Sequence, residues 1–154
     1  MEFVRLPVHQ TAGCLLAHAL AAGSGVIKKG TMLTAAHIQK LQGAGHNDII
    51  VARLSPSDVL ENDAASYFGH VLKGAHVDVR PPFTGRMNLY AATAGLLVLD
   101  ENAIHHFNAC DESITVATLA PYSIVAAGEM VATIKIIPFS VSRDLMERVG
   151  QSAH

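Results

Sequence analysis

Turn and helix-end signals recur at short intervals along this chain, and this constrains the fold more than any other feature. Gly23-Ser24-Gly25 separates two alternating apolar segments, and Gly43, Gly74 and Pro138 each close another segment. Glycine and proline interrupt helices and strands or end them. We therefore expect many short elements joined by tight turns rather than a few long helices.

Segments rich in alternating apolar or β-branched residues predict strands. The predicted strands cover residues 3–8, 15–20, 26–33, 48–54, 76–80, 95–100, 113–118 and 130–137. Gly23-Ser24-Gly25 supplies the turn chemistry of a hairpin between the second and third of these strands.

Four further segments carry helix signals, in which a polar N-cap residue precedes apolar residues at helical spacing. The predicted N-caps are Thr34, Ser55, Asp100 and Ser142. Residues 28–54 read as strand, helix and strand, a compact βαβ-like unit. Together these elements predict an α+β fold with strand-rich mixed sheets and about four short helices.

A chain of 154 residues is expected to form one domain, residues 1–154, or two small lobes that share a core. Such a chain buries roughly two-thirds of its unfolded surface and needs neither a disulfide nor a metal to fold. Half of the residues are apolar and the mean hydropathy is +0.31. We therefore expect a partner, a second subunit or a neighbouring domain to cover part of the surface.

Charge and cysteine usage narrow the classes of partner and the compartment. The net charge is −2 without any block of like charges, which argues against nucleic acid and acidic lipid as partners. No uncharged apolar stretch reaches the ~20 residues of a membrane span. Cys14 and Cys110 form no CxxC pattern and no signal peptide is evident, so we expect a reducing cytoplasm.

Side chains with potential metal or nucleophilic chemistry are scattered. Nine histidines occur without an HxH or HExxH motif, so they predict solvated surface positions and no metal site. Asp111 and Glu112 follow Cys110 and would raise the pKa of its thiol, which favours a packing role. The chain also lacks GxGxxG and GxxxxGK[ST], the usual glycine-rich phosphate loops.

The segment RPPFTGRMNLYA, residues 80–91, is the strongest candidate site. Its arginines carry planar guanidinium groups suited to phosphate or carboxylate, and its prolines stiffen the predicted loop. Thr84 adds a hydroxyl group, Asn88 adds a side-chain amide, and Gly85 adds a backbone that a ligand can approach closely. The candidate ligand-binding residues are Arg80, Thr84, Gly85, Arg86 and Asn88.

A structural interpretation of the same segment stays open. The Pro-Pro pair would then be a rigid exit from a strand, with Arg86 pairing with a surface carboxylate such as Asp78 or Asp100. The residue types alone do not decide between a ligand loop and a structural turn.

Three stretches together resemble a known family: VIKKGTMLTAAHIQKLQGAGHNDIIVARL, PPFTGRMNLYAATAGLLVLD and ESITVATLAPYSIVAAGEMVATIKIIPF. They are similar to the N-terminal region of bacterial molybdopterin-binding proteins, which are related to molybdopterin molybdenumtransferases and often fused to a molybdenum cofactor nucleotidyltransferase domain. The resemblance covers roughly residues 3–141, and its most specific parts are the FTGR-N-L segment and the KIIPF strand. The Thr-Gly and Ser-Gly-Gly phosphate loops of the family's molybdopterin-binding domain have no counterpart here.

The resemblance implies a binding and assembly module of molybdenum cofactor biosynthesis, with molybdopterin as cofactor and molybdate as a second ligand. The expected partners are a pterin phosphate or other small anion, and an adjacent molybdopterin-binding domain or a second copy of the chain. Catalytic residues are not identified, and catalysis would belong to the larger protein. Two alternatives remain: an enzyme acting on a phosphorylated or carboxylated molecule with His70 or His76 as base, and a structural dimerisation domain.

Overall fold

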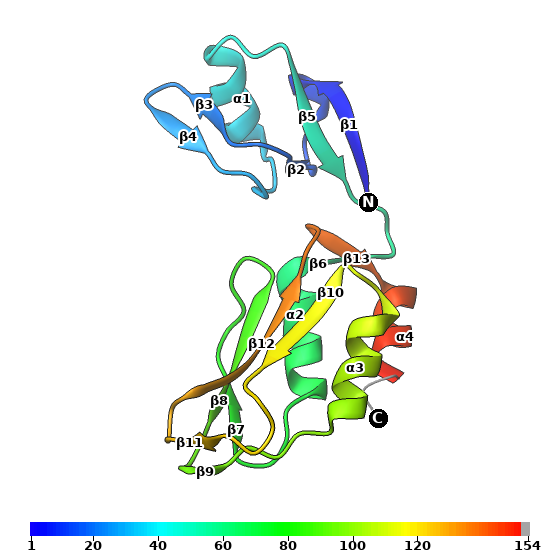
Figure 1. The fold of residues 1–154 in the computed structure, drawn as a ribbon. Coiled ribbons are helices and arrows are strands. Elements are labelled where there is room, and N and C mark those ends of the chain that lie inside the picture. Colours follow the sequence, from blue (N-terminus) through cyan, green and yellow to red (C-terminus); the bar gives the residue numbers. More distant parts are fainter. Residues whose placement is uncertain (152–154) are drawn as a thin grey trace. The chain divides into compact units, whose positions relative to one another are not determined.

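The computed structural model describes residues 1–151. The chain divides into two compact units, Met1–Pro56 and Ser57 onward, and each has its own buried apolar cluster. Within residues 1–151 there are four α-helices and thirteen short strands, which confirms the predicted α+β class and the number of helices (Figure 1).

The first unit holds a three-stranded sheet, a separate hairpin and one α-helix. Its elements are β1 (Glu2–Pro7), the 3-10 helix η1 (Val8–Gln10), β2 (Leu15–Leu16), β3 (Leu20–Ala22), β4 (Gly25–Ile27), α1 (Ala35–Gly43) and β5 (Asp48–Arg53). The sheet order is β1-β5-β2, and β3 pairs with β4 across the predicted Gly23-Ser24 turn.

Helix α1 begins and ends where the sequence predicts. Thr34 is its N-cap, and the Thr34 backbone N–H donates to Nδ1 of His37 at 3.2 Å, closing a capping box. The βαβ-like unit forms only in part. Residues 31–33, just before α1, bond antiparallel to residues 13–16, and β2 pairs antiparallel with β5, so β2 separates the two segments that flank α1. These segments do not pair with each other as neighbouring parallel strands would.

The second unit is built on a four-stranded antiparallel sheet of order β10-β12-β8-β7. The pairs β11-β9 and β13-β6 flank it. The elements are β6 (Asp58–Leu60), α2 (Glu61–Val71), β7 (Val77–Val79), β8 (Arg86–Ala91), β9 (Gly95–Leu96), α3 (Glu101–Cys110), β10 (Ile114–Thr118), β11 (Ile124–Val125), β12 (Met130–Ile136), β13 (Ser140–Ser142) and α4 (Arg143–Gln151).

One face of this sheet carries the core, because helices α2, α3 and α4 contribute to a single buried cluster with it (Figure 1). The Phe68 ring of α2 meets the Phe107 ring of α3 edge to face, with centroids 5.3 Å apart. Gly69 lies where an added Cβ would be 2.3 Å from the sulfur of Met87, so α2 sits close against β8. Alternate residues of the strands therefore point away from the helices.

Two predicted boundaries in this unit are wrong. Helix α2 begins at Glu61 rather than after Ser55, because residues 58–60 form β6 and pair with β13, about eighty residues later in the chain. The predicted loop 80–91 becomes strand β8 from Arg86 onward. The predicted caps of the other helices are confirmed: Asp100 accepts from the Ala103 N–H at 3.0 Å, and Ser142 accepts from the Leu145 N–H at 3.2 Å.

Candidate anion-binding face

The FTGR segment forms a two-residue hairpin turn. The Phe83 N–H donates to the Arg86 carbonyl at 2.9 Å, and the Arg86 N–H donates to the Phe83 carbonyl at 3.1 Å. The two central residues both have positive φ, +47° at Thr84 and +70° at Gly85. This is the geometry of a type I′ turn, which matches the twist of the strands it joins. Thr84 and Gly85 thus define where β8 begins.

Gly85 is buried, and its backbone groups are used inside the protein. Its N–H donates to Oδ1 of Asn62 on α2 at 2.9 Å, and its carbonyl accepts from the Ile136 N–H of β12 at 2.7 Å. A Cβ at this position would lie 2.7 Å from the Ile136 carbonyl oxygen. The approachable backbone that the sequence predicts at Gly85 is therefore unavailable to a ligand. The glycine anchors the turn to α2 and β12 instead.

Beyond the turn, β8 alternates between the core and the opposite face of the sheet. Met87, Leu89 and Ala91 are buried, whereas the residues between them face away from the core. The register with β12 places Lys135 opposite Arg86 and Thr133 opposite Asn88. The side chains that gather on this side of the sheet, called the polar face below, are those of Asp78, Arg80, Arg86, Asn88, Tyr90, Thr133 and Lys135.

Hydrogen bonds and ring contacts fix the centre of the polar face. The Thr133 hydroxyl donates to Oδ1 of Asn88 at 2.7 Å, and Nδ2 of Asn88 donates to the Tyr90 hydroxyl at 3.3 Å. The Arg80 guanidinium carbon lies 3.9 Å from the centroid of the Tyr90 ring. A guanidinium stacked on a ring keeps its N–H edge free for a planar acceptor. The Arg80 guanidinium is thus held against the Tyr90 ring.

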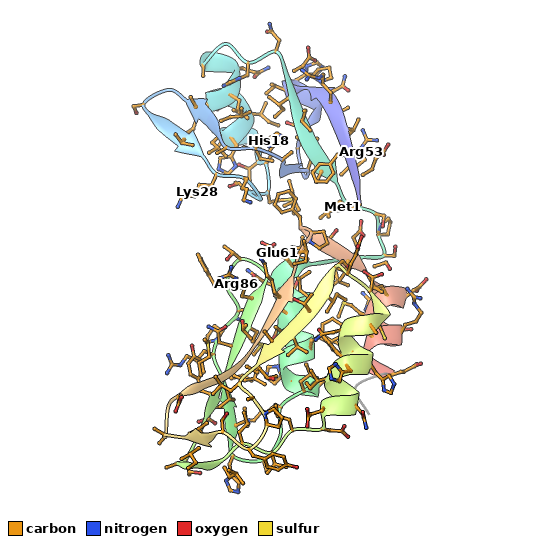
Figure 2. The ribbon with its side chains drawn as sticks, in the orientation of Figure 1. Met1, His18, Lys28, Arg53, Glu61 and Arg86 are labelled. Atoms are coloured by element: carbon orange, nitrogen blue, oxygen red, sulfur yellow. The ribbon has the colours of Figure 1, made fainter. Side chains whose placement is uncertain are left out.

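Two cations face each other beside this network. Arg86 and Lys135 are directly opposite in the β8–β12 ladder, and both are exposed (Figure 2 labels Arg86). Like charges in that position repel each other and destabilise a sheet. The turn at residues 83–86 follows the Pro-Pro exit from β7, as the structural interpretation expects. Of the carboxylates suggested as partners of Arg86, Asp100 caps α3 and Asp78 lies opposite Tyr90.

The structure does not bring the histidines together with the arginines. His70 lies on α2, where its Nδ1 contacts the Ser66 carbonyl at 2.7 Å. His76 precedes β7, and its carbonyl accepts from the Ala92 N–H, just past the end of β8. Five residue steps of about 3.3 Å along β8 place that end roughly 16 Å from Arg86. The end of β8 beside His76 is therefore distant from Arg86.

No group of three or more histidine, cysteine or acidic side chains that could hold a metal occurs within residues 1–151. The eight histidines in that range are exposed or half-buried, and the ninth, His154, lies outside the described residues. Cys14 is buried and Cys110 is exposed, and both are free thiols.

A family model described as a domain of unknown function (DUF8806) matches residues 5–53. The match falls within the first unit and does not include the polar face. No curated protein and no solved structure matches the chain significantly. In the described part of the chain, every helix is too short or too polar to cross a membrane.

Sequence reasoning missed three members of the polar face: Tyr90, Thr133 and Lys135. The signal for two of them was present in MVATIKII, residues 130–137, where Thr133 and Lys135 interrupt an apolar strand two residues apart. That spacing places both side chains on one face of the strand. What the sequence did not contain was the register that sets this strand against β8.

Proposed function

We propose that this chain is a binding and assembly module of molybdenum cofactor biosynthesis, acting in the cytoplasm. The polar face binds the phosphate of a pterin, or another small oxyanion such as molybdate. An adjacent molybdopterin-binding domain or a second copy of the chain supplies the remaining contacts to the pterin. No reaction step is assigned to this chain itself.

One observation carries the proposal: Arg86 and Lys135, both exposed cations, oppose each other on neighbouring strands. A bound oxyanion between them would turn the repulsion into two charge-assisted hydrogen bonds. Arg80, stacked on Tyr90, offers a third cationic group on the same face. The net charge of −2 means that overall attraction would not draw an anion to the chain, so any affinity must be local.

The class of ligand comes from the resemblance to molybdopterin-binding proteins, and the geometry supports only its anionic part. The FTGR segment that carries the resemblance sets the start of β8 and thereby the position of Arg86. This gives the motif a physical role that is consistent with the proposal. Its Thr-Gly pair shapes the turn, and its arginine would make the contact.

The test is isothermal titration of the chain with 6-hydroxymethylpterin monophosphate, with the same pterin lacking phosphate, and with molybdate. Hydrogen bonds to charged groups contribute about 1.5–3 kcal/mol. Since 1.4 kcal/mol corresponds to a factor of ten in affinity, we expect Arg86→Gln to weaken phosphate-ester binding by roughly ten- to a hundred-fold. Lys135→Gln should weaken it as well, and the pterin without phosphate should bind far more weakly to the unmodified chain.

Lys73→Gln is the matched control, because Lys73 is an exposed cation of the same unit that lies after α2 and outside the polar face. This variant should retain full affinity. Equal losses in Arg86→Gln and Lys73→Gln, or no loss in both Arg86→Gln and Lys135→Gln, would refute anion binding at this face. Affinity for the phosphate-free pterin alone would refute the role of phosphate.

A further inference from the structure

The second unit contains a pocket that the proposed function does not use. It has a volume of about 480 Å³ and lies on the helix side of the four-stranded sheet, whereas the polar face lies on the other side. The sheet contributes its inward side chains, among them Leu89, Val116 and Val131. The first turn of α3, the end of α2 and residues 95–99 form the other walls. Pockets of 300–1,000 Å³ with apolar walls are typical small-molecule sites.

Backbone hydrogen bonds hold the outer wall of this pocket in place. The Leu97 N–H donates to the Ser123 carbonyl at 2.9 Å, and the Tyr122 N–H donates to the Leu97 carbonyl at 2.8 Å. The Ala92 N–H donates to the His76 carbonyl at 2.8 Å and ties the neighbouring segment to the start of β7. These bonds fix the backbone of the outer wall, so closing the pocket by moving that wall would require them to break.

The charge of the lining indicates what the pocket can bind. His76 and Asp100 are the only ionisable residues along it, and neither arginine nor lysine contributes. Asp100 already accepts the Ala103 N–H as the cap of α3. An anion would meet apolar walls and a carboxylate, with neither arginine nor lysine to offset its desolvation. Thr93 and Thr118 also line the pocket and supply hydroxyl groups that can orient an uncharged ligand.

We propose that this pocket binds a neutral, largely apolar ring compound of about one or two fused rings. The polar face would take the anion and this pocket the uncharged ring compound, on opposite sides of one sheet. The two sites share no side chain. The inference is independent of the proposed function, so each can fail without the other.

Indole is a suitable probe, and its binding can be followed through amide shifts in ¹H–¹⁵N correlation spectra of the chain. We expect saturable shifts at pocket residues such as Leu89 and Val116. Indole-3-acetate, which adds a carboxylate to the same ring, should bind at least tenfold more weakly. Ala103→Leu should weaken indole binding at least tenfold, because Ala103 lines the pocket in the first turn of α3 and a longer side chain would fill it.

Ala109→Leu is the matched control, since Ala109 lies on the same helix, is exposed and does not line the pocket. It should leave indole affinity unchanged. If Ala103→Leu lowers the unfolding midpoint, Ala75→Phe is the second blocking variant, since Ala75 lines the pocket from the segment between α2 and β7. Shifts scattered over the surface, or indole affinity insensitive to both blocking variants, would overturn the proposal. So would sedimentation showing a dimer that indole dissociates, since a second copy would then occupy the pocket.

Discussion

Replacing Gly85 by alanine should destabilise the second unit far more than the same change at another glycine with positive φ. At φ +70° an alanine costs about 1–2 kcal/mol relative to glycine. The new Cβ would also lie 2.7 Å from the Ile136 carbonyl oxygen, a backbone atom held in β12. Relief of that contact would move the turn and weaken the Gly85 hydrogen bonds to Asn62 and Ile136, at about 0.5–1.5 kcal/mol each. The expected loss is therefore about 3 kcal/mol.

Gly128→Ala provides the comparison. Gly128 has φ +79°, and an added Cβ there would meet no atom within 4 Å, so only the conformational cost of about 1–2 kcal/mol applies. The chain has no tryptophan, and its three tyrosines, Tyr67, Tyr90 and Tyr122, all lie in the second unit. Tyrosine fluorescence during urea unfolding therefore reports on that unit alone. Free energies of unfolding that agree within about 0.5 kcal/mol for the two variants would refute the argument that close packing at Gly85 fixes the turn.

Three further predictions concern local stability. Thr84→Asn should stabilise the second unit by a few tenths of a kcal/mol up to about 1 kcal/mol in the same urea assay, because asparagine tolerates the positive φ of a type I′ turn better than threonine. Asn108→Ala should cost about 1–3 kcal/mol of unfolding free energy, since the Asn108 amide bonds both the N–H and the carbonyl of Val116 and would leave both partly buried groups unpaired. Hydrogen bonds from the Ser113 hydroxyl and backbone N–H lower the pKa of Asp111 in the folded protein. The ionised Asp111 carboxylate therefore stabilises the fold above its unfolded pKa, and this stabilisation is lost as pH falls through the lower folded pKa. Asp111→Asn should make the free energy of unfolding less dependent on pH in that acidic range.

Local signals predicted the helices and most strands of this fold because caps and alternation act over a few residues. Thr34 and Asp100 each cap a helix through contacts three residues away, so the information lies within one turn of chain. The start of α2 is different. Ser55-Pro56 resembles a helix start, yet residues 58–60 pair with β13, and no pattern near Ser55 identifies that partner. Long-range pairing overrode local propensity there.

The same distinction explains the candidate site. The residue types in RPPFTGRMNLYA indicated that this segment could bind an anion. Two of its candidate residues, Arg80 and Arg86, do lie on one exposed face. The sequence suggested a loop because Pro, Thr and Gly are turn residues, but only residues 83–86 turn, and residues 86–91 alternate as a strand. Once β8 is a strand, its register decides which cation stands beside Arg86. Lys135, forty-nine positions further along the chain, is set there by backbone pairing. The motif therefore needs a strand from elsewhere in the chain to become a site, and substitutions that shift the β8–β12 register should abolish anion binding even when Arg86 is unchanged.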